Sequence, residues 1–152
     1  MANTYTQITI QIIFAVKGRE NFIKPAFKED LFKYIAGIIR NKRQKLLCIN
    51  GMPDHLHILI GLQPTMSLSD LVRDVKANSS RWVNEQRLLP WKFGWQEGFG
   101  AFSYSRSQRS AVIRYIENQE HHHAKRSFRE EYFEMLKKFE VEYNQKYVFE
   151  FF

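Results

Sequence analysis

The alternation of apolar and polar residues along the chain predicts four strands. Residues 4–16 alternate cleanly, which is typical of a half-buried strand with one core face and one solvent face. Two further strands are predicted over 45–52 and 54–62, and the short turn between them makes the pair an antiparallel hairpin. A short fourth strand is expected over 101–105, after a segment rich in Trp, Phe and Gly.

Apolar residues at helical spacing predict four helices between and after these strands. Three of them cover residues 26–40, 108–123 and 129–139. The fourth begins after Ser67 or Ser69, either of which can cap it, and ends before Pro90. The order β-α-β-β-α-β followed by helices is that of an α+β protein with the ferredoxin-like, RRM-like split β-α-β fold. We therefore expect a four-stranded antiparallel sheet with two helices on one face, and the 108–123 helix on the other.

Composition narrows the class of protein. A chain of 152 residues, 44% of them hydrophobic, has the length and composition of one globular domain, which we assign to residues 1–152. The net charge of +7 and the pI near 9.6 favour a polyanionic partner such as nucleic acid. Cys48 is the only cysteine, which excludes an internal disulfide and fits the cytoplasm, and we predict no signal peptide or membrane span. The aromatic tail, residues 141–152, is expected to pack down.

The third predicted strand carries two histidines, His55 and His57. Residues i and i+2 of a strand point to the same face, so the two imidazoles are expected side by side. Neutral imidazole is the commonest protein metal ligand, but the pair is equally well explained as surface histidines on a solvated strand face. If the 108–123 helix crosses this face, Gln119 can supply a third, oxygen ligand.

Tyr115 lies one helical turn before Gln119, on the same face of the predicted helix. It is either an ordinary packed tyrosine or a nucleophile beside a metal. A phenol has a reference pKa of about 10 and attacks poorly at neutral pH. A divalent cation on a scissile phosphate would neutralise charge and orient the phosphate, and attack would leave a covalent phosphotyrosine.

These residues resemble the motifs of a known family, the HUH-superfamily single-tyrosine transposases of small bacterial insertion sequences. The similarity rests on the His-hydrophobic-His run at His55–His57 and the Tyr-x-x-x-Gln run at Tyr115–Gln119. Three further segments are similar to that family: KANSSRW at 76–82, WQEGFGAFSYS at 95–105 and QEHH at 119–122. The resemblance covers nearly the whole chain, in the expected order.

The resemblance implies a transposase that cuts and rejoins single-stranded DNA at hairpin-bearing element ends. Tyr115 would form a 5′-phosphotyrosine, and His55, His57 and Gln119 would bind Mg²⁺ or Mn²⁺. Because the donor set is rich in nitrogen, we expect Mn²⁺ to bind more tightly in vitro. The resemblance also implies a homodimer in a bacterial or archaeal cytoplasm, in which the partner subunit can complete the active site in trans.

Several assignments stay open at the level of sequence. Lys76, Arg81, Arg106 and Arg109 are candidate DNA-binding residues, although Lys76 and Arg81 also suit an ordinary solvated helix surface. His122 and His123 either approach the metal or simply suit the C-terminal end of a helix. Alternative functions are a domesticated nuclease acting on palindromes, a non-catalytic module that binds single-stranded nucleic acid, and a phosphoesterase that activates water.

Overall fold

The computed structural model describes residues 3–144 and 148 of the chain. Its strands and helices, in chain order, are β1 (Thr9–Ala15), α1 (Pro25–Asn41), β2 (Lys45–Met52), β3 (His55–Gly61), α2 (Leu68–Glu85), β4 (Gly100–Tyr104), α3 (Arg109–Glu117), α4 (Gln119–His123) and α5 (Phe128–Lys138). Short 3-10 turns precede α1 and α3, at Lys17–Arg19 and Arg106–Gln108. The predicted element order is therefore confirmed.

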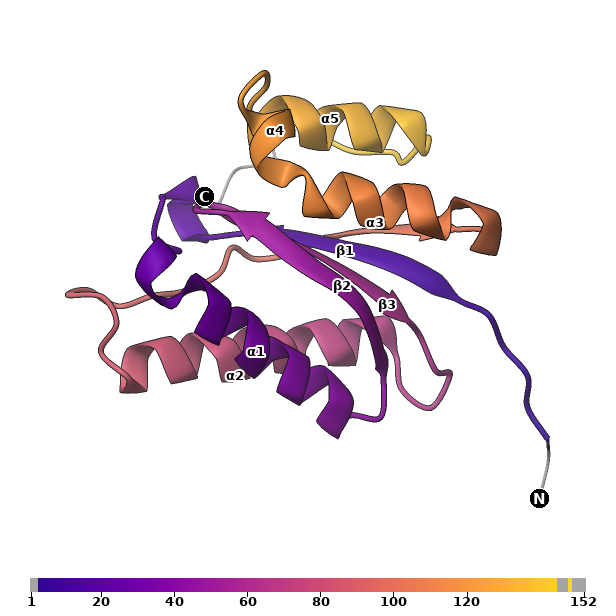
Figure 1. The fold of residues 1–152 in the computed structure, drawn as a ribbon, viewed down its shortest axis with the longest axis horizontal. Coiled ribbons are helices and arrows are strands. Elements are labelled where there is room, and N and C mark those ends of the chain that lie inside the picture. Colours follow the sequence, from indigo (N-terminus) through magenta and orange to yellow (C-terminus); the bar gives the residue numbers. More distant parts are fainter. Residues whose placement is uncertain (1–2, 145–147, 149–152) are drawn as a thin grey trace.

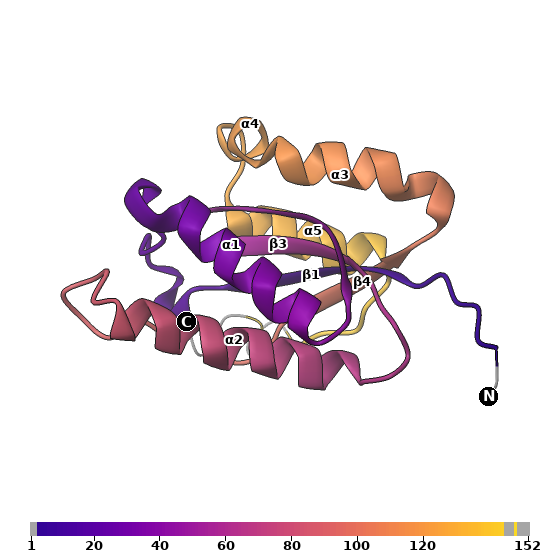
Figure 2. The same ribbon diagram turned by 60° about the horizontal axis from the view of Figure 1, so that its bottom comes forward.

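The four strands form one antiparallel sheet in the order β2-β3-β1-β4. Helices α1 and α2 lie side by side on one face (Figures 1 and 2). Helices α3, α4 and α5 cover the opposite face (Figure 1). This is the predicted split β-α-β plan, with the helix that carries Tyr115 on the second face.

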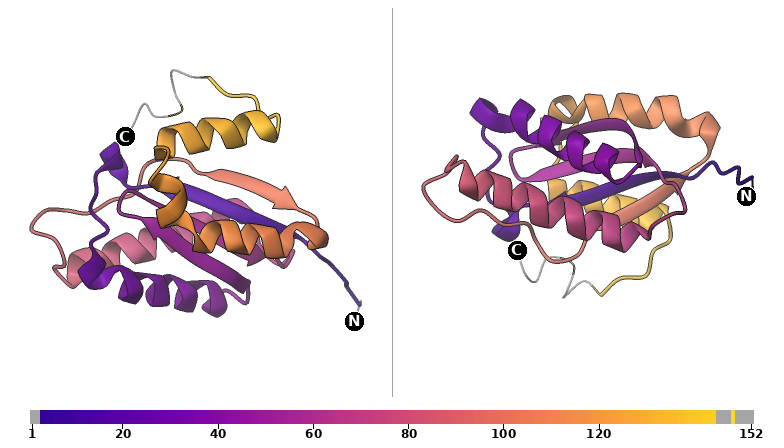
Figure 3. Two further views of the ribbon diagram at one scale, coloured as in Figure 1. Left: turned by 45° about the horizontal axis from the view of Figure 1, so that its top comes forward. Right: turned by 90° about the horizontal axis from the view of Figure 1, so that it is seen from below.

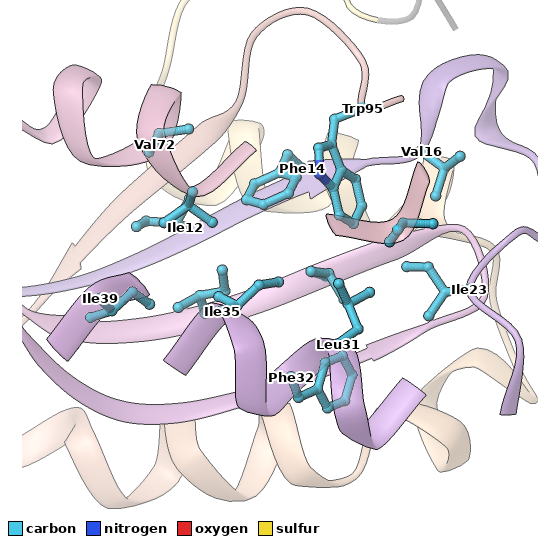
Figure 4. Packing of buried hydrophobic residues seen from close by; sticks show 14 of the residues in the cluster. Ile12, Phe14, Val16, Ile23, Leu31, Phe32, Ile35, Ile39, Val72 and Trp95 are labelled. Carbon is cyan, nitrogen blue, oxygen red and sulfur yellow. The ribbon is translucent and has the colours of Figure 1, made fainter. Parts of the chain in front are cut away.

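The face toward α1 and α2 holds the larger hydrophobic core. Ile12 and Phe14 of β1, and Val16 directly after the strand, point into this core (Figure 4). The Phe14 ring meets the Trp95 ring edge-on, with 4.8 Å between centroids. The strand period of two sends these side chains to one face, and the apolar stripes of α1 and α2 cover them. On the opposite side of this core, α1, the segment before it and α2 contribute Ile23, Leu31, Phe32, Ile35, Ile39 and Val72.

The second face is also buried, and this corrects the prediction of a half-buried first strand. The strand begins at Thr9 instead of residue 4, and Thr9, Gln11 and Ile13 are buried beneath the C-terminal helices. The polar residues on this face therefore do not meet solvent, although their alternation with apolar residues suggested that they would. They face a second layer of helices.

Helix α5 packs tightly against β1 and β4 through Phe128, Tyr132 and Leu136. A Cβ added at Gly100 would lie 2.7 Å from the hydroxyl oxygen of Tyr132, so only a glycine leaves room for this ring. Helix α3 instead lies over β2 and β3, next to α5 (Figure 3, left). The two helices thus divide the second face between them.

Two smaller predictions concern helix ends and the tail. Ser67 caps α2, since its hydroxyl accepts a hydrogen bond of 3.1 Å from the backbone N–H of Asp70. The tail is predicted to pack down, but Val141 and Tyr143 are exposed. Among its described residues, Val148 packs against the residues of α5, and the Tyr143 ring lies 5.5 Å from the Phe133 ring, measured between centroids. Residues 145–147 and 149–152 lie outside the described part of the chain. Within that part, every helix is too short or too polar to cross a membrane.

Candidate active site

His55 and His57 project from β3 into the second face, where both are completely buried. The Nδ1 atom of His55 lies 2.7 Å from Oδ1 of Asp54, and Nδ1 of His57 lies 2.6 Å from Oε1 of Gln11. Because both oxygens are acceptors, each Nδ1 carries the hydrogen of its bond. The two Nε2 atoms are therefore turned toward the helices. The pair stands side by side as its spacing predicted, but it is not a solvated surface pair.

A break between α3 and α4 positions the Tyr115–Gln119 segment over the histidines. The sequence predicted one continuous helix, but α3 ends at Glu117 and α4 begins at Gln119. The Asn50 side chain donates hydrogen bonds to the carbonyl oxygens of Ile116 (2.9 Å) and Glu117 (3.2 Å). These carbonyls have lost their helical partners, so Asn50, which pairs with His57 in the sheet, anchors the break.

Both residues of the Tyr-x-x-x-Gln run reach the histidines from this segment. Oε1 of Gln119 lies 3.3 Å from Nε2 of His55. The Tyr115 ring lies 6.1 Å from the His57 ring, measured between centroids. Tyr115, His55, His57 and Gln119 therefore meet in one place, and all four belong to the same chain.

A carboxylate from α5 lies at the centre of this group. Oε1 of Glu131 is 3.0 Å from Nε2 of His57, 3.1 Å from Nε2 of His123 and 3.5 Å from Nε2 of His55. One ligand atom from each of these four residues lies within 4.8 Å of all the others. Glu131 is completely buried, so neighbouring side chains have to stabilise its charge in place of water.

The Tyr115 hydroxyl bridges this carboxylate and a cation. It donates a hydrogen bond to Oε2 of Glu131 and accepts one of 3.0 Å from Arg126. The His122 ring stacks on the tyrosine ring, with 4.4 Å between centroids. A hollow of about 370 Å³ opens beside the tyrosine and is lined also by Gln11 and Tyr104 of the sheet. The hydroxyl is thus held in place and lies next to an open space.

The electrostatics of the site oppose ionisation of the phenol. Burial raises the pKa of Tyr115, and the charge and hydrogen bond of Glu131 raise it further, while Arg126 works in the opposite direction. Burial also acts on Glu131, but hydrogen bonds from His123, His55 and His57 outweigh it and hold the pKa of the carboxyl well below its usual range. The site therefore contains an ionised carboxylate and a phenol that keeps its proton.

The two strand histidines differ in their protonation. At His57, burial dominates and lowers the pKa. At His55, burial acts in the same sense, but hydrogen bonds to Asp54 and Glu131 overcome it and raise the pKa. Buried imidazoles beside an ionised carboxylate form a donor set that a cation can complement.

The four candidate DNA-binding residues do not form one surface. Lys76 and Arg81 lie on α2, on the side of the sheet away from Tyr115, whereas Arg106 and Arg109 lie at the start of the α3 segment. Nζ of Lys76 donates to the backbone carbonyls of Gln96 (3.0 Å) and Gly98, and burial lowers its pKa to about 8. Lys76 and Arg81 also line a shallow hollow of about 720 Å³, together with Arg73 and Lys92.

Sequence reasoning missed several members of the site, namely Gln11, Asn50, Asp54 and Glu131, and left His123 open. A signal was available for Glu131. Phe128, Glu131, Tyr132 and Met135 follow the i, i+3, i+4, i+7 spacing of a buried helical stripe, so a charged residue sits on the apolar face of α5. A charge in that place is rare unless it has a partner.

Comparison with known proteins identifies the family to which most of the chain is similar. The family model described as "Transposase IS200 like" matches residues 4–119. The ISDra2 transposase TnpA of Deinococcus radiodurans is 25% identical over 118 residues, which cover 74% of this chain and 84% of that protein. The matched region runs from before β1 to Gln119 and stops short of His123 and Glu131.

Solved structures agree with this match at the level of the fold. A crystal structure assigned to a candidate transposase from Deinococcus radiodurans R1 aligns with a TM-score of 0.62 and 23% identity, covering 78% of this chain and 96% of that one. The structure of a REP-associated tyrosine transposase bound to a REP hairpin gives a TM-score of 0.58 and 16% identity, covering 78% and 70%. By its family match and its fold, the chain belongs to the IS200-like transposases.

Proposed function

We propose that the protein cleaves and rejoins single-stranded DNA at hairpin-bearing element ends, with Tyr115 as the nucleophile and a divalent metal as cofactor. One observation carries the proposal: the Tyr115 hydroxyl, the Gln119 amide and the Nε2 atoms of His55 and His57 converge in one site. Membership of the transposase family supports DNA as the substrate. The REP hairpin bound by a protein of the same fold supports hairpin ends.

The residues present fit a metal ion. Asp54 and Gln11 engage the Nδ1 atoms of the two histidines, which leaves the Nε2 lone pairs free to coordinate. With Oε1 of Gln119, these atoms would hold the cation, and the two imidazoles favour Mn²⁺ over Mg²⁺ in binding strength. When bound there, the cation supplies positive charge that stabilises the developing charge on the phosphoryl oxygens.

The chain's own residues then prepare the covalent step. Arg126, 3.0 Å from the Tyr115 hydroxyl, favours the ionised phenol and so partly opposes the effect of Glu131. The tyrosine oxygen forms a bond to phosphorus, the bond from phosphorus to the 3′ oxygen breaks, the phenol gives up its proton and the 3′ oxygen gains one. The products are a 5′-phosphotyrosine and a 3′-hydroxyl. Because one phosphate ester bond replaces another, a free 3′-hydroxyl can attack the phosphotyrosine, reverse the step and reseal the strand.

The surroundings of Tyr115 suit a single strand. The hollow of about 370 Å³ beside the hydroxyl is bordered by Arg126 and Lys138, whose charges would complement a phosphate, and by Glu134, which pairs with Arg126. The active site is built within one chain, so the homodimer that we propose from the family does not have to exchange the Tyr115 helix. Basic residues on the far face, Arg73, Arg81 and Lys92, are our candidates for contacts to a hairpin stem.

A cleavage assay tests the proposal. Labelled single-stranded DNA with imperfect palindromes is incubated with the protein and Mn²⁺, and the products are separated on a denaturing gel. We expect cutting by the wild type, none in EDTA, and none by His57→Ala, which should still bind the hairpin. Cutting that survives both EDTA and His57→Ala would refute the metal assignment, and cutting that survives Tyr115→Phe would point to water as the nucleophile.

A further inference from the structure

We propose that Glu131 of α5, together with His123 of α4, is a ligand of the divalent metal, so that the segment after Gln119 completes the metal centre. The inference rests on the proposed metal dependence and extends it to residues that lie beyond the family match, which ends at Gln119. It assigns to α5 a role in the chemistry as well as in packing.

The spacing of the donor atoms supports this assignment. Two atoms that each lie about 2.1 Å from one ion, at angles of about 90–110°, are about 3.0–3.4 Å apart. Oε1 of Glu131 lies 3.0 Å from Nε2 of His57, 3.1 Å from Nε2 of His123 and 3.5 Å from Nε2 of His55. The first two distances fall within this range and the third lies just above it. The four donor atoms all lie within 4.8 Å of one another, so small shifts would let them share one ion.

The hydrogen-bond pattern points the same way. For each of the two strand histidines, the N–H hydrogen is already engaged at Nδ1, by Asp54 for His55 and by Gln11 for His57. When both rings are neutral, their Nε2 atoms present lone pairs toward Glu131, so a cation could take the place of the hydrogens that bond these groups in the metal-free site. A divalent ion between the Nε2 atoms and Oε1 would supply the positive charge that favours a completely buried carboxylate.

Helix α5 is held so that Glu131 cannot turn away. Ser127 and Glu130 form a reciprocal cap at the start of the helix. One residue later, the Phe128 ring stacks on the His55 ring, with 4.0 Å between centroids. Tyr132, the residue after Glu131, is seated over Gly100 of β4. A ligand needs such fixed neighbours to meet an ion in a defined geometry.

The two oxygens of Glu131 face two different parts of the site. Oε1 faces the imidazoles, while Oε2 accepts the hydrogen bond of Tyr115 and lies 3.4 Å from Nε2 of Gln119. One carboxylate therefore connects the metal ligands to the nucleophile. It also adds a charged oxygen to a donor set otherwise made of imidazoles and an amide, which suits Mn²⁺ and Mg²⁺ better.

Metal titration in the absence of DNA tests the inference independently of cleavage. The full chain is freed of metal with EDTA, and Mn²⁺ binding is measured by isothermal titration calorimetry. We expect Glu131→Gln to weaken Mn²⁺ binding about tenfold or more, and His123→Asn to weaken it less. The matched control is Glu120→Gln, which removes the same charge from an exposed side chain on α4 and should leave the affinity unchanged.

The outcomes separate this inference from the proposed function. Wild-type affinity in Glu131→Gln, with binding lost in His57→Ala, would overturn the role of Glu131 and leave the metal-dependent transposase intact. A wild type that binds no Mn²⁺ would overturn both. If Glu131→Gln does not fold, hydrogen exchange on the wild type decides: Mn²⁺ should slow exchange across α5, and protection confined to the strand histidines would refute the inference.

Discussion

The two faces of the sheet share the same strands but differ in the side chains that they bury. One face buries an apolar core, and the other buries polar side chains beside smaller apolar clusters. Toward α1 and α2, β1 and the residue after it contribute Ile12, Phe14 and Val16 to the larger hydrophobic core. Toward α3–α5, the same strand contributes Gln11, and β3 contributes two buried histidines that meet a buried glutamate. Burial of the apolar set stabilises the fold in proportion to the area removed from water.

Burial of the polar side chains destabilises the fold unless each of them has a hydrogen-bond partner. Buried amides, imidazoles and carboxylates lose their hydration, and an unpaired one costs about 1–3 kcal/mol or more. On this face the partners are one another: Gln11 with His57, Asp54 with His55, and Glu131 with three imidazoles and Tyr115. The first face therefore contributes mainly to the stability of the fold, whereas the second face also buries the polar groups that we assign to the chemistry. The predictions below aim to separate the two.

The largest effect is expected from the apolar face. Phe14 is completely buried, so Phe14→Ala should lower the free energy of unfolding by about 3–5 kcal/mol, measured in urea. The Mn²⁺ affinity of the folded protein should not change, because the ring points away from the site. Phe14→Leu should give a smaller loss of the same kind. A parallel fall in Mn²⁺ affinity would show that the two faces are not separable.

A residue that contacts a proposed metal ligand on the polar face should affect Mn²⁺ affinity more than the free energy of unfolding. Gln11→Leu removes the acceptor that holds Nδ1 of His57 and should weaken Mn²⁺ binding about 10–100-fold, measured by calorimetry. Gln44→Leu is the matched control. Gln44 is also buried, and it exchanges hydrogen bonds with the backbone of Gln63, far from the site. Equal losses of Mn²⁺ affinity in the two variants would contradict the account.

The smallest effect concerns the anchor of the helix break. Asn50→Leu leaves the carbonyls of Ile116 and Glu117 without partners and should cost about 1–2 kcal/mol of unfolding free energy. Cleavage should slow about tenfold or more, because Tyr115 and Gln119 are no longer held in register. Asn84→Leu breaks two similar bonds to the backbone of Phe93. It should destabilise the fold without slowing cleavage, and an equal slowing would contradict the positioning role of Asn50.

Those features that follow from local backbone geometry could be predicted from sequence. His55 and His57 share a face because a strand repeats every two residues, and the structure shows them side by side. Tyr115 and Gln119 were placed together by helical spacing. They do reach one site, although the predicted single helix breaks at Asn118, where Asn50 replaces the missing helical bonds.

What depends on tertiary packing could not be predicted. The contact of Gln11 with His57 follows from the pairing of β1 with β3, and that of Glu131 follows from the docking of α5. The alternation along the first strand predicts that its polar face is exposed, because polar residues at alternate positions of a strand usually contact solvent. Here Thr9 and Gln11 are buried. A polar strand face can therefore indicate a buried functional layer.

The most direct test of the central claim is to look for DNA covalently attached to Tyr115. The protein is incubated with hairpin-bearing single-stranded DNA and Mn²⁺, denatured, digested with nuclease and protease, and examined by mass spectrometry. We predict that the peptide containing Tyr115 carries a nucleotide through a phosphotyrosine, and that EDTA and Tyr115→Phe abolish it. Metal-dependent cutting with no modified peptide would contradict the account and assign the attack to water.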